Sequence, residues 1–174
     1  EYGNDTHSST AVADLDNDGS LDVVMSGSLI SVTGQTAIFY WNVAKNTVST
    51  YSALDAGYPN GWPWGTGRVN LYDSDNDGFV NVNFIAGSQL FSLKTDDATH
   101  SLLNQKWVRA INDSRSGIVT VTCYDFDNDG NPEIVYRDSQ ELAVIDGATG
   151  ASKLWSAPCQ SHTFSRSEEH TSEL

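Results

Sequence analysis

One acidic pattern occurs three times in this chain, in residues 14–22, 73–81 and 125–133. Each copy begins Asp-x-Asp-Asn-Asp-Gly, so that carboxylates alternate with other residues up to a glycine. Oxygen ligands at alternate positions around a glycine turn are what Ca²⁺ requires from a short loop. Because the pattern recurs at intervals of roughly fifty to sixty residues, it also indicates that the chain consists of copies of one structural unit.

Each position of the loop has a chemical reason to hold a metal ion. Positions 1, 3 and 5 are Asp, and carboxylates this close repel one another unless a cation neutralises them. Position 6 is Gly, where the chain turns sharply, and position 9 offers a further side-chain oxygen; position 7 varies, as expected if only its backbone carbonyl binds. The alternative is a polar turn that binds nothing, and three copies with one ligand order favour the metal. The expected ligands of up to three Ca²⁺ ions are Asp14, Asp16, Asp18, Ser20 and Asp22; Asp73, Asp75, Asp77, Phe79 and Asn81; and Asp125, Asp127, Asp129, Asn131 and Glu133.

The residues that flank the loops exclude the helical calcium sensors. An EF-hand needs a bidentate Glu at position 12, where this chain has Met25, Phe84 and Tyr136. Apolar residues alternate with period two after each loop, and strand-like segments precede each loop. The pattern therefore predicts that each loop joins two strands as a hairpin.

These strand–loop–strand units resemble the FG-GAP or VCBS repeat, the blade of integrin-α-like β-propellers. The resemblance implies an all-β fold, a partial β-propeller of about three four-stranded antiparallel blades with Ca²⁺-binding hairpin loops. The implied blades are residues 1–57, 58–113 and 114–160. The expected strands are 9–13, 21–26, 36–43 and 47–53; 68–72, 79–86, 89–94 and 106–111; and 118–124, 132–137, 142–146 and 153–156.

The C-terminal end has a different character. Residues 166–174 match the in-frame translation of a common short-read sequencing adapter, and we expect them to be an artefact rather than natural sequence. Residues 161–165 would then begin a further blade. Three blades form an open arc whose outward faces lack partners, so we expect the chain to be prone to association.

The net charge and the acidic loops restrict the kinds of partner and the location that we expect for this protein. The net charge is −14, and nearly half of the 23 acidic residues lie in the three loops. Such acidity argues against a nucleic-acid partner, and no apolar run is long enough to span a membrane. Weak oxygen sites fill where Ca²⁺ is near millimolar, which together with the resemblance predicts a secreted or cell-surface protein. Two cysteines are too few for a disulfide framework, and we expect Cys123 and Cys159 to be buried thiols.

The sequence favours a non-catalytic module. No histidine lies in a nucleophile, metalloprotease or redox motif, and the paired carboxylates already belong to the repeated loops. By the resemblance, the expected function is recognition or adhesion through an extracellular protein or carbohydrate ligand. The alternatives are the propeller part of a secreted polysaccharide lyase-like enzyme and a lectin propeller. Since Asn81 is neutral, we expect the second loop to bind Ca²⁺ most weakly.

The aromatic residues suggest a second candidate site. Tyr58, Trp62 and Trp64 lie in the connection between the first two blades and could form a platform for a sugar or a protein. The favoured alternative is that these rings fill the gap between adjacent blades. We expect Trp41, Trp107 and Trp155, which lie in predicted strands, to belong to the core.

Overall fold

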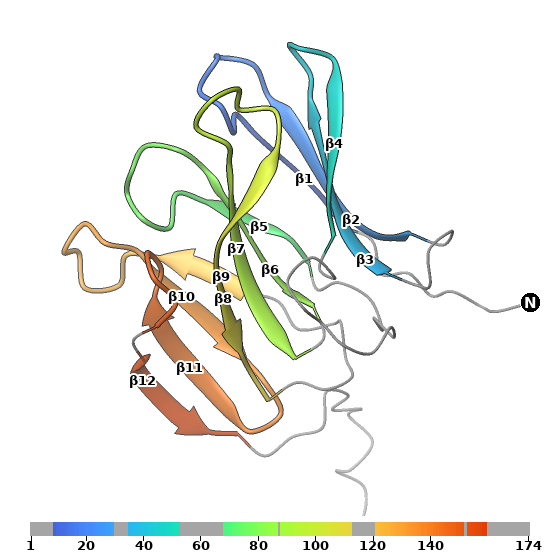
Figure 1. Cartoon of the computed structure of the whole chain (residues 1–174). Coiled ribbons are helices and arrows are strands. Elements are labelled where there is room, and N and C mark those ends of the chain that lie inside the picture. Colours follow the sequence, from blue (N-terminus) through green and yellow to red (C-terminus); the bar gives the residue numbers. More distant parts are fainter. Residues whose placement is uncertain are drawn as a thin grey trace, which may run out of the picture.

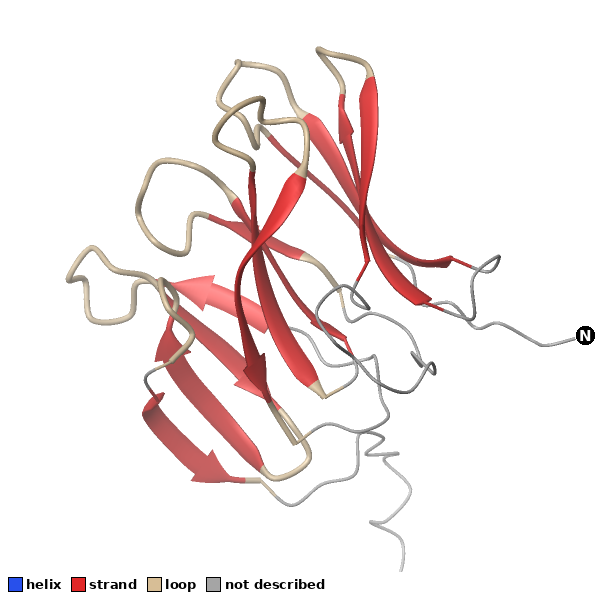
Figure 2. Cartoon of the chain, in the orientation of Figure 1, coloured by secondary structure: helices blue, strands red, loops and turns tan. Residues whose placement is uncertain are grey.

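The computed structural model describes residues 9–29, 35–52, 68–86, 88–112, 121–151 and 153–159. Within these ranges the protein is all-β, with three four-stranded antiparallel sheets and no helix (Figures 1 and 2). The described part of the chain accordingly contains no helix long and apolar enough to cross a membrane.

Each sheet is a meander of four consecutive strands. The first sheet contains β1 (Thr10–Ala13), β2 (Asp22–Leu29), β3 (Gln35–Asn42) and β4 (Thr47–Ser52). The second contains β5 (Asn70–Tyr72), β6 (Asn81–Ala86), β7 (Gln89–Thr95) and β8 (Leu103–Ala110). The third contains β9 (Val121–Tyr124), β10 (Glu133–Arg137), β11 (Glu141–Asp146) and β12 (Lys153–Pro158). Each strand expected from the sequence overlaps one of these, and each acidic loop joins the first two strands of its sheet.

The three sheets pack face to face, and their β1–β2, β5–β6 and β9–β10 loops lie along one edge of the stack (Figure 1). One core cluster lies between the first and second sheets and includes Tyr40 and Phe91. A second cluster, between the second and third sheets, includes Trp107 and Ile134. Strand β6 is buried at every residue because its sheet is covered on both faces. The alternation seen in the sequence therefore becomes continuous burial in the middle sheet.

The end sheets correct two of the three tryptophan predictions. Trp107 belongs to the core, as expected. Trp41 and Trp155 are 43 % and 52 % exposed, so their assignment to the core was wrong. Both lie on faces that point away from the middle sheet. The strand positions were predicted correctly, but the sequence pattern does not reveal which faces lack a neighbouring sheet.

Both cysteines are free thiols. Cys123 is buried in the second core cluster, as expected, and burial raises the pKa of its thiol to about 12. Cys159 is only partly buried. The proposed aromatic platform of Tyr58, Trp62 and Trp64, the expected start of a further blade at 161–165 and the adapter-like segment 166–174 all lie outside the described residues.

Candidate metal centres

The three acidic loops share one unusual backbone. Position 4 is Asn in each loop, at residues 17, 76 and 128, with φ of 57°, 54° and 59°. Position 6 is Gly, at residues 19, 78 and 130, with φ of 88°, 89° and 89°. Asn tolerates this left-handed region better than most residues, and Gly enters it without steric cost. This role of the Asn was not predicted, although its presence in all three copies was the available signal.

The first carboxylate organises each loop by accepting two backbone N–H bonds. Asp14 accepts from the amides of Asp18 and Gly19, at 3.1 and 2.9 Å. The corresponding distances are 3.1 and 2.8 Å at Asp73, and 3.1 and 3.0 Å at Asp125. These bonds curl the chain around the carboxylate, so the side chains at positions 1 and 3 converge in all three loops.

The residue at position 9 closes each loop onto its own strand. Asp22 accepts the N–H of Leu15 at 3.2 Å, and Glu133 accepts the N–H of Phe126 at 2.8 Å. Asn81 accepts both the N–H and the hydroxyl of Ser74, at 2.7 and 2.8 Å. Position 9 thus has a structural role in all three loops, whether its side chain is charged or neutral.

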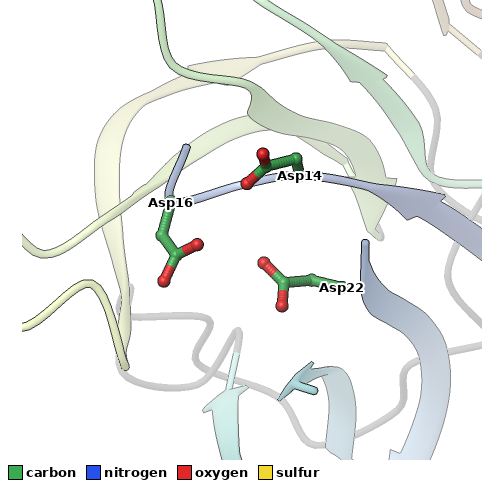
Figure 3. A group of neighbouring side chains, drawn as sticks. All are labelled: Asp14, Asp16 and Asp22. Carbon is green, nitrogen blue, oxygen red and sulfur yellow. The ribbon is translucent and has the colours of Figure 1, made fainter. Parts of the chain in front are cut away.

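Each loop brings together three carboxylates, and one oxygen from each lies within 4.8 Å of one oxygen from each of the others. The groups are Asp14, Asp16 and Asp22; Asp73, Asp75 and Asp77; and Asp125, Asp127 and Glu133. Figure 3 shows the first group, in which the carboxylates turn toward a shared space. Two oxygens bound to one Ca²⁺ lie at most about 5 Å apart, twice the usual Ca–O distance. The spacing therefore fits a single ion in each loop.

The first group is the most buried. Asp22 is fully buried, and Asp16 is 8 % exposed. Burial raises the pKa of Asp22 despite the amides of Val43 and Leu15 that donate to it. Burial also opposes ionisation of Asp16, but hydrogen bonds from Lys45 and Asn42 outweigh it and lower that pKa. Although Oδ2 of Asp16 accepts these bonds, its buried Oδ1 has no hydrogen-bond partner.

Lysines reach the first two groups from other parts of their sheets. Lys45, in the β3–β4 turn, contacts Asp16 with a nitrogen–oxygen distance of 2.8 Å. Lys94 on β7 contacts Asp77 at 2.6 Å, and Lys106 on β8 forms an ion pair with Asp75. Burial lowers the pKa of Lys106. Among the described residues, no lysine or arginine forms an ion pair with the third group.

The remaining predicted ligands lie in the loops but outside these groups. Asp18 and Asp129 each direct one oxygen to the backbone N–H two residues later, at Ser20 and Asn131. Asp77 bonds the N–H of Phe79 in the same way, yet it also belongs to its group. The Phe79 ring stacks on His100, with centroids 5.3 Å apart.

Neighbouring loops are also connected to each other. The side-chain nitrogen of Asn17 donates to the carbonyl of Gly78 in the second loop, at 2.6 Å. Asn76 lies against Gly130 of the third loop, where its nitrogen would be 3.7 Å from an added Cβ. The Asn at position 4 therefore serves both the loop backbone and the junction between sheets.

Comparisons of the chain with protein-family models, curated proteins and solved structures found no match.

Proposed function

We propose that this chain is a calcium-stabilised segment of a β-propeller in a secreted or cell-surface protein. Three sheets in one orientation, with edge strands β1, β5 and β9 in contact, support the propeller arrangement. The observation that carries the proposal is the repetition of three converging carboxylates in three loops of equal backbone geometry.

Burial is the second argument for a cation. An ionised carboxylate in a buried group is costly unless a charge or several hydrogen bonds compensate it. In the first loop, Asp16 has a buried oxygen without a partner, and Asp22 is fully buried beside it. A divalent ion among these oxygens would supply the missing interaction and reduce the repulsion between the carboxylates.

In this proposal the ion is structural. It would hold the loop between the first two strands of each sheet, and the Asn17–Gly78 bond would couple adjacent loops. The protein that contains this segment would act in recognition or adhesion, with an extracellular protein or carbohydrate as ligand and no catalytic step. The loops that carry the carboxylate groups lie along one edge of the stack (Figure 1).

Calcium titration by isothermal calorimetry tests the proposal. We expect up to three ions to bind, with Mg²⁺ as the matched control that binds more weakly, because it dehydrates reluctantly and demands a regular octahedron. A variant with Asp125→Asn and Asp127→Asn should lose one site and keep the others. Absence of calcium binding at millimolar concentration would contradict the proposal.

A further inference from the structure

Each sheet has two different faces. Comparing equivalent positions in the three sheets shows which neighbouring sheet each face packs against. At position 12, counted from the first Asp of each loop, Phe84 packs in the core against the first sheet and Tyr136 packs in the core against the second. The residue at this position in the first sheet is Met25, which is 41 % exposed. The first sheet therefore exposes the face that the other two sheets bury.

This exposed face carries a continuous apolar row. Its members are paired directly across β1, β2, β3 and β4: Val12, Val23, Trp41 and Val48. Val12 is 53 % exposed and Val48 is 67 % exposed. The corresponding row of the second sheet runs through Val82 and Leu93, which are both fully buried against the first sheet.

The third sheet exposes the complementary face. Trp155 is paired with Val144 on β11, in the place where Trp107 is paired with Ser92 in the second sheet. Trp107 crosses to the next sheet, where its indole N–H donates to the carbonyl of Gly147 at 3.0 Å. Trp155 has the same position on its sheet and is 52 % exposed.

We propose that the β9–β12 face of one molecule stacks on the β1–β4 face of a second copy, head to tail. Where no further sheet of the same protein covers these faces, the occupant is a second copy, because the chain carries both kinds of face that meet at its two internal junctions. Burying Trp41 and Trp155 in this contact would remove two large exposed side chains from water. Since the two faces differ, the contact is heterologous, and copies can add head to tail until a ring closes.

One residue sets how closely the copies can approach. The ring of Trp107 lies 2.4 Å from the place that a Cβ on Gly150 would occupy, so this junction requires glycine. In the first sheet the corresponding turn residue is Asn46, which also has a positive φ, of 50°. Its side chain limits how deeply Trp155 of another copy can enter. The contact between copies is therefore looser than the internal one, and Asn46→Gly tightens it.

Sedimentation velocity over a range of protein concentrations, in calcium-containing buffer, tests this contact. The unmodified chain forms dimers and larger species as concentration rises, whereas Trp41→Arg and Trp155→Arg each stay monomeric. An equal mixture of the two variants gives a heterodimer, since each variant retains the face that the other lacks. Each substitution lowers the self-association constant by roughly tenfold or more. Asn46→Gly raises this constant, which non-specific adhesion of apolar surfaces would not do.

The controls separate loss of the contact from loss of the fold. Circular dichroism and thermal unfolding should match the unmodified chain for both variants, because both side chains are already exposed. Val48→Lys is a second variant of the β1–β4 face, for use if Trp41→Arg fails to fold. The proposal is overturned if the unmodified chain is monomeric at all concentrations. It is equally overturned if a folded variant self-associates as strongly as the unmodified chain or if the mixture remains monomeric.

Discussion

The first and second acidic loops have the same backbone but different charges. Their position-1 carboxylates accept the same two amides at almost equal distances, and their left-handed residues agree within a few degrees. At position 9, however, the first loop has Asp22 and the second has Asn81. One lysine reaches the first loop and two reach the second. The comparison shows that hydrogen bonds set the shape of the loop, while its charge is free to vary.

Cation affinity should follow the charge rather than the shape. Calcium sites gain affinity with the number of charged ligands, and an ammonium group on a ligand carboxylate competes with the ion. The second loop has three carboxylates in its group and no acidic side chain at position 9, and Lys94 and Lys106 contact two of the three. The structure thus adds a second reason to the prediction that this loop binds Ca²⁺ most weakly.

The largest expected effect is loss of a whole site. Asp14→Ala removes a ligand and the acceptor of two amides, and Asp73→Ala makes the same change in the second loop. A site occupied at about 100 times its dissociation constant stabilises the fold by about 2.7 kcal/mol. We therefore expect Asp14→Ala to cost more than Asp73→Ala in urea unfolding with calcium, and the two to cost the same with a chelator. Equal costs in calcium would contradict the difference between the loops.

Exchanging the residues at position 9 should exchange the affinities. Asn81→Asp adds a carboxylate, and its oxygens can keep both bonds from Ser74, while the Nδ2 that it removes has no partner. We expect calcium affinity at the second loop to rise on the order of tenfold, equivalent to about 1.4 kcal/mol. Asp22→Asn is the reciprocal variant and should weaken the first loop. If calorimetric titration shows the same calcium affinity in both variants as in the unmodified chain, the residue at position 9 does not determine the affinity.

Removing the competing lysines should also raise calcium affinity, but by less than Asn81→Asp does. Lys94→Met keeps much of the side chain's apolar length and frees Asp77, so calcium affinity at the second loop should rise by a few fold. Lys45→Met is the matched variant for Asp16 in the first loop. In chelator, both variants should be slightly less stable because the carboxylates lose a counter-charge. If calcium binds both variants more weakly, the lysines support the sites rather than compete for them.

The smallest expected effect concerns the bond between loops. Asn17→Gly permits the positive φ but removes the donor to the Gly78 carbonyl. Asn128→Gly is the control, since it makes the same change in the third loop, where the described residues show no such bond. We expect Asn17→Gly to cost about 1 kcal/mol more in urea unfolding. Identical costs would mean that the bond contributes nothing to the junction between the first two sheets.

Features set by neighbouring residues were predictable from the sequence, whereas contacts between residues far apart in the sequence were not. Period-two alternation located the strands, and the repeated Asp pattern located the loops, because both signals lie within a few adjacent residues. The lysines on Asp16, Asp75 and Asp77 come from strands or turns that only the folded sheet brings near the loop. Likewise, Trp41 and Trp107 both lie in predicted strands, and their burial differs because only Trp107 has a neighbouring sheet on its face.

Thermal unfolding with calcium and with a chelator tests the central claim most directly, that ions held by the three carboxylate groups stabilise the stacked sheets. For a chain of this length, about 2.7 kcal/mol from one well-filled site raises the melting temperature by roughly 5–10 °C, and further sites add to it. We expect the melting temperature to rise with calcium concentration, to rise less with magnesium, and to fall when the calcium is chelated. A melting temperature that stays the same from chelator to millimolar calcium would contradict the account.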